Sequence, residues 1–520
     1  MTDDAAWRPA ASPWLITAVA TLAPFMEILD TTIVNVSLPY VSGSLSSSYN
    51  DATWVLTSYL VANGMVLPVA GWIGKVIGRK RYFLICIAMF TICSFLCGIA
   101  TSLPELVAFR LLQGLFGGGL QPNQQAIVLD TFEPAQRGRA FSIVAVAVIL
   151  APVLGPVLGG IITDNASWRW VFLMNVPVGI AAFLLVARFV EDPPWVLRDR
   201  ARLRDIDYTG IGLIALGLGA LQIMLDRGED LDWFGSPFIR LMAFLGLVGL
   251  AGATAWLLLT DRPVVDLRAL GDRNFGVGVI TISAIGAILY SSNLLIPAFA
   301  QTTLGYSALD AGWLMTPGAA VMILFIPIVA KLALPNFQTR HLLAFGFVVL
   351  AGASWWAHRL TPQIDSASLA AFRAIQSVAL AFLFVPNSTL AYSTLPRRLN
   401  ADAAALYSMF RNIAGSGGIA ITVALVEQRR QAEQAALVGP LAPVHAPYAR
   451  LMAGLVARLE AMGHGAAGAR RLAEGWVLHA LGQQASTLAY ADVFALTAVV
   501  ALAVVPLTFL FRGSVATGRG

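Results

Sequence analysis

The sequence predicts an all-α integral membrane protein, and the evidence is its composition, its long apolar segments and the distribution of its basic residues. Of 520 residues, 58% are hydrophobic and only 12% are charged, whereas soluble domains average about 45–50% and about 25%. The mean hydropathy is +0.73 and the isoelectric point is near 9.2. So few charges cannot cover the surface of a water-soluble protein of this size, which excludes a cytosolic enzyme or a nucleic-acid-binding protein.

Fourteen segments are apolar over the length of about 20 residues that a membrane-spanning helix needs. An even number of spans places both ends of the chain on the same side of the membrane. The predicted spans are 14–38, 53–73, 82–101, 105–128, 139–163, 169–190, 207–226, 240–260, 275–300, 309–333, 341–359, 367–392, 403–426 and 489–511.

The basic residues predict the orientation of these spans. Of the 34 Lys and Arg residues, 20 fall on the side of the N-terminus and four in the short loops of the opposite side. Cytoplasmic loops carry the excess of Lys and Arg, so both termini are predicted to be cytoplasmic. The first apolar segment is long, carries two acidic residues and lacks a small-residue cleavage pattern, so no cleavable signal is expected.

Two breaks in hydropathy divide the chain into three parts. The segment 191–206 joins a Pro pair to a basic run, and a second polar break begins at 261. We therefore expect a six-helix bundle in 1–190, a cytoplasmic linker with two extra helices in 191–262, and a second six-helix bundle in 263–520. Two bundles of equal size indicate an internal repeat, which is common in transporters.

Two carboxylates fall near the middle of the first span. Glu27 and Asp30 are three residues apart, which places them on one face of a helix. A charge at this depth is costly and usually faces a bundle interior where it serves a transport pathway. Neighbouring carboxylates in a poorly solvated cavity are suited to exchanging a proton for a substrate. The alternative is a polar contact between helices near the surface.

Buried basic residues lie in both halves of the sequence. Arg110, in the fourth span, needs a carboxylate or several carbonyls as a partner, and either Glu27 or Asp30 is available. Arg373 and Arg411 form a matching basic pair in the second half, although Arg411 also fits a residue reaching toward the headgroups. Further candidates for the lining of a substrate cavity are Tyr59, Asn63, Gln113, Asn123, Tyr290, Asn293 and Phe384.

The fifth span contains glycines that favour close helix packing. Gly155, Gly159 and Gly160 remove side chains from one stripe of the helix, so that a neighbouring helix can approach. Pro152 and Pro156 loosen the backbone hydrogen bonding in the same helix.

Several motifs occur in a characteristic order. Residues 29–39 read LDTTIVNVSLP, 71–81 read GWIGKVIGRKR, 109–114 read FRLLQG, 155–160 read GPVLGG and 168–177 read WRWVFLMNVP. Together they resemble the fourteen-span drug:proton antiporters of the major facilitator superfamily, most closely the EmrB/QacA type. The resemblance is dense over 26–180 and thinner through the rest of the chain.

This resemblance implies a major facilitator fold with two six-helix bundles and two linker helices. It further implies alternating-access export of hydrophobic compounds across the inner membrane in exchange for protons, with no cofactor. Gly71, Gly78 and Arg79 belong to the cytoplasmic loop motif, in which Lys75 stands where the family has Asp. That Asp is expected to brace one conformation, so the sequence leaves open whether the loop does so here.

An insertion of about 60 residues, 427–488, precedes the last span. Leu451, Leu455 and Leu459 form an apolar stripe at helical spacing. We expect amphipathic helices that pack on the outer face of the transporter itself. The alternative, suggested by the resemblance, is docking of a periplasmic adaptor, which would join the protein to an outer-membrane channel in a tripartite pump.

Two rival functions remain open at this point. One is a major facilitator uniporter or importer of a small metabolite, against which the motif of the fifth span argues. The other is a membrane sensor or enzyme that transports nothing. The sequence contains no GxxxxGK[ST], HExxH, GxSxG or paired CxxC pattern, so nucleotide hydrolysis, common hydrolytic sites and a metal site are not predicted. Membrane lipids, hydrophobic compounds and protons are the expected partners.

Overall fold

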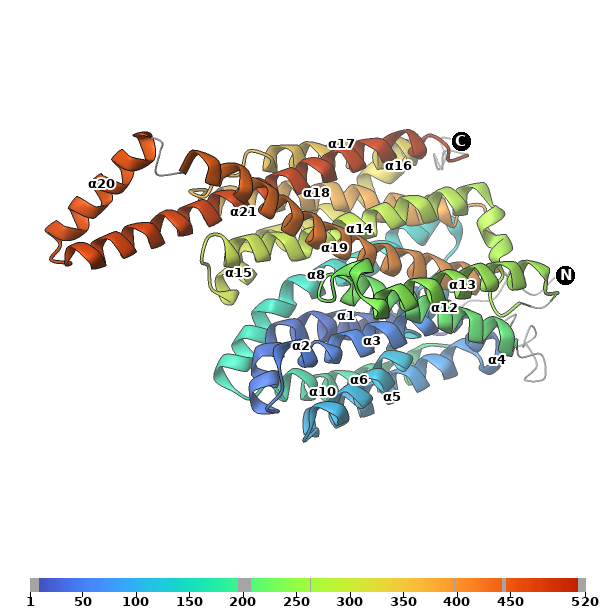
Figure 1. The fold of residues 1–520 in the computed structure, drawn as a ribbon. Helices are drawn as coiled ribbons and strands as arrows, with labels where there is room; N and C mark the ends of the chain where they lie inside the picture. Colours follow the sequence, from blue (N-terminus) through green and yellow to red (C-terminus); the bar gives the residue numbers. More distant parts are fainter. Residues whose placement is uncertain (1–8, 195–206, 262, 397–398, 442–445, 513–520) are drawn as a thin grey trace.

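The computed structural model describes residues 9–194, 207–261, 263–396, 399–441 and 446–512, and the fold over these residues is all-helical (Figure 1). The basic run at 195–206, which the sequence analysis used as a domain boundary, lies outside the described residues. Both ends of the described chain lie at one end of the molecule, as the even number of predicted spans requires.

The first bundle is built from the helices before residue 190. Two of its spans are bent by more than 40°: α3 and α4 meet at an angle of 59°, and α8 bends by 41° between Gln136–Pro152 and Val157–Thr163. The helices are α1 (Pro13–Ser44), α2 (Tyr49–Ala52), α3 (Trp54–Val66), α4 (Ala70–Ile77), α5 (Arg79–Ile99), α6 (Leu103–Gly117), α7 (Leu120–Thr131), α8 (Pro134–Asn165), α9 (Trp170–Leu173) and α10 (Asn175–Phe189).

The linker pair consists of α12 (Tyr208–Arg227) and α13 (Pro237–Leu259). These helices approach closely at two glycines, since a Cβ on Gly217 would lie 2.6 Å from the backbone nitrogen of Leu250. A Cβ on Gly249 would lie 2.5 Å from Gly217 itself. On its other sides α12 contacts α3 of the first bundle and α19 of the second.

The second bundle follows the linker pair and carries a long helical extension. Its second span continues from α15 through a π-helical turn, Val329–Ala333, into the short α16. The helices are α14 (Arg273–Thr302), α15 (Ala308–Ile328), α16 (Leu334–Asn336), α17 (Thr339–Ala357), α18 (Ser366–Ala391), α19 (Asn400–Val438), α20 (Ala446–Ala461) and α21 (Ala466–Thr508).

The two bundles repeat one packing pattern. In each, the first span packs on the fifth (α1 on α8, α14 on α19), and the second on the fourth (α3 on α6, α15 on α18). The third packs on the sixth in both (α5 on α10, α17 on α21). The internal repeat predicted from two sets of six spans is therefore visible in the helix packing.

Ten helices among the described residues are long and apolar enough to cross a membrane, or up to twelve when each bent pair counts as one span. Two of the fourteen predicted spans fall outside this set. Span 105–128 is divided into α6 and α7, of 15 and 12 residues, and span 341–359 corresponds to the 19-residue α17, which is less apolar at both ends. The protein is a multi-pass helical membrane protein, and fourteen spans remain a prediction.

The insertion at 427–488 is helical but does not pack as predicted. Helix α19, of 39 residues, continues into it as far as Val438, and α21, of 43 residues, begins within it at Ala466. Between them α20 has no buried residue and packs mainly on α21, so the hairpin projects away from the bundles (Figure 1). The expected packing on the outer face is therefore wrong for α20. The reason is that 427–438 consists largely of strong helix formers, without Gly or Pro to end the helix.

Candidate transport cavity

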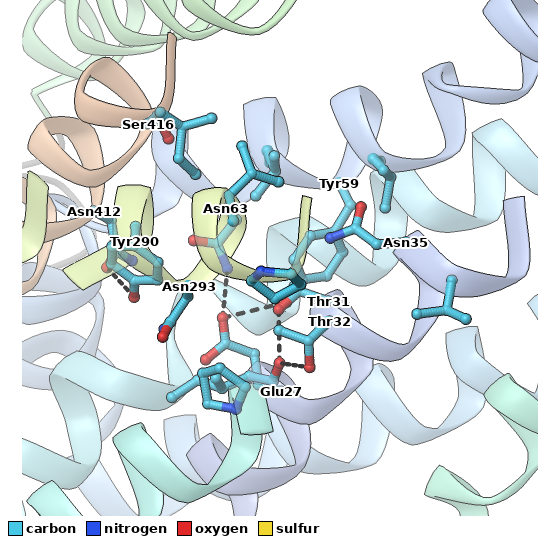
Figure 2. Close-up of a pocket in the computed structure, with 18 of the residues that line it drawn as sticks. Glu27, Thr31, Thr32, Asn35, Tyr59, Asn63, Tyr290, Asn293, Asn412 and Ser416 are labelled. Atoms are coloured by element: carbon cyan, nitrogen blue, oxygen red, sulfur yellow. Dashed lines mark hydrogen bonds between the residues drawn. The ribbon is translucent and has the colours of Figure 1, made fainter. Parts of the chain in front are cut away.

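A cavity of about 800 Å³ lies between the two bundles, within the range of small-molecule binding sites. Its walls come mainly from α1, α3 and α8 of the first bundle and from α14 and α19 of the second (Figure 2). The lining also includes Arg110 of α6, Gln121 of α7, and Ala311 and Gly312 of α15. The linker helix α12 contributes Gln222, whose amide donates to the hydroxyl of Ser416 at 3.0 Å.

The cavity occupies the half of the molecule remote from the chain termini. Its lining runs from Glu27 to Tyr40 along α1 and from Tyr290 to Gln301 along α14. Both helices begin at the end of the molecule that carries the termini. The structure therefore has a cavity toward one side and a closed end toward the other.

Glu27 lies in the wall of this cavity and is 3% exposed. Its carboxylate accepts hydrogen bonds from the amide of Asn63 at 3.0 Å, the hydroxyl of Tyr59 at 3.3 Å and the amide of Gln121 at 2.6 Å. Among the described residues no ion pair involves Glu27. A carboxylate held only by neutral donors in a cavity can gain or lose a proton without breaking a salt bridge.

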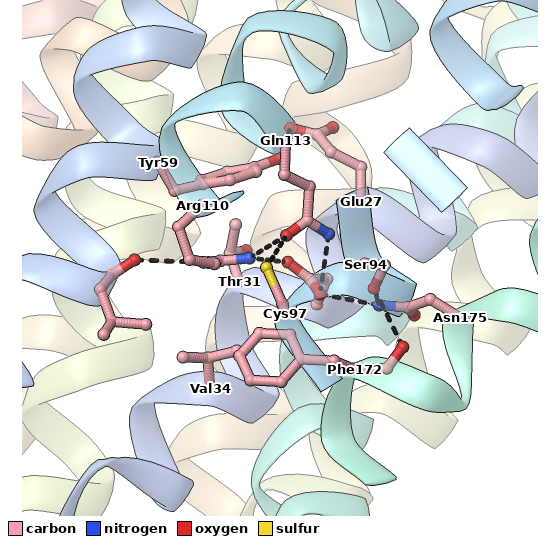
Figure 3. A network of polar contacts seen from close by, with 12 residues as sticks. Glu27, Thr31, Val34, Tyr59, Ser94, Cys97, Arg110, Gln113, Phe172 and Asn175 are labelled. Carbon is pink, nitrogen blue, oxygen red and sulfur yellow. Dashed lines mark hydrogen bonds and ion pairs between the residues drawn. The ribbon is translucent and has the colours of Figure 1, made fainter. Parts of the chain in front are cut away.

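Asp30, one turn further along α1, has different surroundings, formed by Arg110, Gln113 and Asn175, which Figure 3 labels. It is fully buried, and the guanidinium of Arg110 donates to it at 2.5 Å. The amides of Asn175 and Gln113 also donate to it, at 2.7 and 3.4 Å. Arg110 in turn lies 4.3 Å from the ring centre of Tyr59. The partner that the sequence left open for Arg110 is therefore Asp30.

The second bundle buries two arginines near the cavity. Arg373 is 1% exposed and donates to the side chains of Gln376, at 2.7 Å, and Asn293. Arg411 is 2% exposed and donates to Gln121, the residue that also contacts Glu27. The alternative that Arg411 reaches toward the headgroups is wrong, because its side chain points across to α7.

Of the candidate cavity residues, Tyr59, Asn63, Tyr290 and Asn293 line the cavity, and five others do not. Gln113 is turned toward Asp30, and the two arginines lie behind the wall. Asn123 is buried near Gly74 at the closed end. Phe384 belongs to the apolar core, since an aromatic side chain suits a core position as well as a cavity. The residues excluded are Gln113, Asn123, Phe384, Arg373 and Arg411.

The glycines of α8 serve two purposes. A Cβ on Gly155 would lie 2.1 Å from the hydroxyl of Thr32, and one on Gly159 would lie 3.2 Å from a carbonyl of α1. These two glycines therefore allow the close packing of α1 and α8 that was predicted. Gly160 has nothing within 4 Å of its Cβ position and lines the cavity, because it falls outside the stripe that α1 covers. Pro156 lies within α8.

The loop motif braces the closed end of the molecule. Lys75 forms an ion pair with the buried Asp402 of the second bundle. A Cβ on Gly71 would lie 2.7 Å from the carbonyl oxygen of Ala401, so the backbones of the two bundles pass close to each other there. Gly78 ends α4 with a φ of +93°, a conformation that glycine adopts readily. The replacement of the family's Asp by Lys75 left open whether the loop braces one conformation. The brace is present here, as an ion pair between Lys75 and Asp402.

A second contact crosses the closed end beside this one. Arg79 forms an ion pair with Asp130 of α7 and donates to the carbonyl of Ala126 at 3.2 Å. Asp130 also accepts from the amide of Asn400, at the start of α19, at 3.2 Å. Arg79 therefore contacts a residue that joins the two bundles.

Sequence reasoning assigned no role to several residues of these sites. Asn175 belongs to the motif at 168–177, and the clue to its role was the presence of a side-chain amide inside an apolar span. Asp130 and Asp402 lie near helix ends, where acidic residues are ordinary, so the sequence offered no signal for their ion pairs. Gln222 was the one amide in a predicted span of the linker pair, and that was the available clue to its place in the cavity.

Comparisons with known proteins agree with this geometry. The family model described as Major Facilitator Superfamily matches residues 20–419. The chain is 34% identical to the multidrug export protein EmrB of Escherichia coli over 97% of this chain and 96% of that protein. It is 35% identical to the fatty acid resistance protein FarB of Neisseria gonorrhoeae, over 81% and 82%.

Solved structures show the same fold. The human organic anion transporter MFSD10 (TETRAN) is similar with a TM-score of 0.57 at 13% identity, over 94% of this chain and all of that one. A bacterial homolog to the human lysosomal transporter Spinster, in an inward-facing and unoccupied conformation, is similar with a TM-score of 0.54 at 18% identity, over 98% and 100%.

Proposed function

Because this chain belongs to the Major Facilitator Superfamily, a family of membrane transporters and not of enzymes, we propose that it exports hydrophobic compounds in exchange for protons. Relatives named for multidrug export and for fatty acid resistance, each covered over most of its length, support export. The observation that carries the proposal is Glu27, a buried carboxylate in the cavity wall that no cation neutralises directly.

The two carboxylates of α1 take different parts in this proposal. Glu27 faces the cavity, where it binds the proton in one state and lies beside the bound substrate in the other. Asp30 is neutralised by Arg110 and holds the interior of the first bundle together. The proton-coupling set is thus Glu27 with the neighbouring Asp30–Arg110 pair, connected to the second bundle through Gln121 and Arg411.

The orientation inferred from the basic residues assigns a place in the cycle to this conformation. With both termini cytoplasmic, the cavity opens away from the cytoplasm, so substrate leaves and a proton reaches Glu27 in this state. Rocking of the bundles then presents the cavity to the cytoplasm, where the proton is released. Each charge that crosses contributes about 2.3 kcal/mol per 100 mV, so one proton per cycle supports a concentration gradient.

The test uses everted membrane vesicles with an imposed proton gradient. Adding a substrate to vesicles with the unaltered protein should dissipate the gradient, and Glu27→Gln should abolish this response. Glu460→Gln is the matched control, because Glu460 is exposed on α20 and far from the cavity. A proton flux that survives Glu27→Gln at the rate of the control would overturn the assignment of Glu27.

We also propose that the protein is the inner-membrane part of a tripartite pump. The helical hairpin of α19, α20 and α21 projects from the bundles on the side that the orientation places outside. It exposes large apolar side chains, with Met462 74%, Trp476 56% and Leu478 66% exposed, and such patches mark interaction sites. A periplasmic adaptor, itself joined to an outer-membrane channel, fits this surface.

The adaptor proposal is tested by co-purification. A variant with a short linker in place of 442–478 removes the projecting part and keeps Gln483, which contacts Thr303 at 3.1 Å. The variant should no longer retain the adaptor, while it still responds in the vesicle assay. Undiminished capture of the adaptor would contradict the docking role of the hairpin.

A further inference from the structure

One five-residue pattern occurs in both bundles at equivalent positions. Residues 109–113 read FRLLQ and 372–376 read FRAIQ, each in the fourth span of its set of six. In both copies the guanidinium donates to the amide oxygen of the Gln three residues later, at 2.9 Å for Arg110 and 2.7 Å for Arg373. Sequence and geometry therefore identify Arg373 as the counterpart of Arg110.

The residues that face these arginines are not the same in the two copies. Arg110 donates to Asp30 on α1, and Arg373 donates to Asn293 on α14, the first span of each set. Three residues earlier on these helices stand Glu27 and Tyr290. The second bundle thus repeats the first with both carboxylates replaced by neutral side chains.

This replacement leaves positive charge without a matching negative charge in the second bundle. Within the described part of the chain, no ion pair involves Arg373 or Arg411, and the Nε of Arg373 has no hydrogen-bond partner. Both side chains are at least 98% buried. A buried guanidinium without a carboxylate is unfavourable unless an anion compensates it for part of the time.

Asn293 connects this charge to the cavity. It lines the cavity beside Glu27 and Tyr290 (Figure 2). Its amide oxygen accepts a hydrogen bond from the guanidinium of Arg373. Its NH2 group therefore remains for a ligand, and this group can only donate hydrogen bonds. The second-bundle wall therefore offers donors and positive potential, and the first-bundle wall offers the carboxylate of Glu27.

We propose that Asn293, held in place by Arg373, binds the carboxylate or phenolate oxygen of lipophilic weak acids. Charge-assisted hydrogen bonds to such an oxygen are stronger than those to a neutral acceptor. This inference rests on the proposed export function for its physiological meaning, because it names a class of compound that the cavity accepts. It assigns to the second bundle the recognition of the anionic group.

The experiment measures binding to the purified full-length protein in detergent, without a proton gradient. The probes are a fluorescent long-chain fatty acid and the lipophilic cation tetraphenylphosphonium, at a pH where the fatty acid is ionised. Asn293→Asp recreates in the second bundle the arginine–carboxylate pair of the first and cancels the charge of Arg373. We expect it to weaken fatty acid binding at least tenfold and to leave tetraphenylphosphonium binding equal or tighter.

Two further variants make the result specific. Asn35→Asp places the same carboxylate at another, exposed cavity position, where no contact with an arginine is found among the described residues, and should change fatty acid binding less than threefold. Asn293→Ala removes the donor without adding charge and should weaken fatty acid binding at least threefold, which decides the question if Asn293→Asp does not fold.

The outcomes separate this inference from the proposed function. Unchanged fatty acid binding by the Asn293 variants, or equal loss of both probes, would overturn the subsite. If the vesicle assay shows no proton flux but the Asn293 variants behave as expected, the subsite stands and the antiport proposal fails. If proton flux depends on Glu27 and the Asn293 variants bind both probes normally, only the subsite fails.

Discussion

Two ion pairs of this protein differ in which bundles they join. At the closed end Lys75 of the first bundle pairs with Asp402 of the second. At mid-depth Arg110 pairs with Asp30, and both belong to the first bundle. If the bundles move against each other as rigid bodies, the first pair separates in every cycle and the second stays intact.

Burial matches this division. The side chain of Lys75 is 29% exposed, whereas those of Arg110 and Asp30 are fully buried. A pair that must separate needs water close by to solvate its charges, and a pair that never separates can be buried among amides. The comparison therefore predicts that mid-depth substitutions reduce the stability of the fold, and that closed-end substitutions change which conformation is populated.

The largest effect is expected for Asp30→Asn. This substitution leaves the guanidinium of Arg110 buried without a counter-charge, which typically costs about 3–5 kcal/mol. We expect a marked fall in the melting temperature of the purified protein and loss of transport. The double variant Asp30→Asn with Arg110→Gln removes both charges and should regain most of the stability without regaining transport.

Fluorescence-detected size-exclusion chromatography after heating measures this difference. A single variant that melts like the unaltered protein would show that the mid-depth pair does not stabilise the bundle. A double variant as unstable as the single one would show that packing, and not the unpaired charge, explains the loss.

A large effect on conformation is expected for Gly71→Ala. The added Cβ would lie 2.7 Å from the carbonyl oxygen of Ala401, so the closed end cannot form as it stands. Transport should fall at least tenfold while the melting temperature changes little. Gly43→Ala is the control, because nothing lies within 4 Å of that position on α1, and it should transport normally. Equal activity of the two variants would contradict a closed state sealed at Gly71.

These two sites also show how far the sequence was informative. The charges of Glu27, Asp30 and Arg110 stand out because charged side chains are rare within apolar spans, so the sequence predicted a functional role for them. It could not assign the partner of Arg110, since Glu27 and Asp30 share one helix face and differ by a single turn. The structure decides between them, because Arg110 donates to Asp30, which also accepts from Gln113 and Asn175.

The fold was predictable to a similar extent. Hydropathy predicted the helices and the two sets of six, because each span must bury an apolar surface in lipid or in its neighbours. The direction of the 427–488 hairpin could not be predicted, because nothing in its amphipathic stripes says whether they face the bundles or one another. Phe384 was wrongly assigned to the cavity for a related reason, since apolar packing alone does not separate core from cavity.

A moderate effect is expected for Lys75→Gln, which removes the charge that pairs with Asp402. Lys75 is 29% exposed but Asp402 only 3%, so losing the charge of Lys75 should cost about 1 kcal/mol or more, and the closed end should open at least fivefold more often. Maleimide labelling of Ala405→Cys, a position that is buried in the closed state, measures this opening in a background without the three native cysteines.

Exchanging the two charges provides the control for Lys75. Lys75→Asp combined with Asp402→Lys restores an ion pair of reversed polarity, and labelling of Ala405→Cys should return toward the starting rate. If Lys75→Gln labels no faster than the unaltered background, the pair does not contribute to closure. If the exchanged pair labels as fast as Lys75→Gln, the contact depends on more than charge.

The smallest effect is expected outside the membrane, in the hairpin, where Arg430 donates to Glu427 at 2.7 Å. This bond holds the pKa of Glu427 below its ordinary value of 4.5, so its stabilisation is present above the ordinary pKa and is lost as the pH falls through the lowered one. Both side chains are more than a third exposed, and solvent screening reduces the stabilisation from such a pair to about 0.5 kcal/mol or less.

Arg430→Ala should therefore leave transport unchanged and alter the melting temperature by about 1 °C or less at pH 7. A loss of transport in this variant would show that an ion pair other than Lys75–Asp402 and Arg110–Asp30 also governs the cycle, which contradicts the comparison of these two pairs.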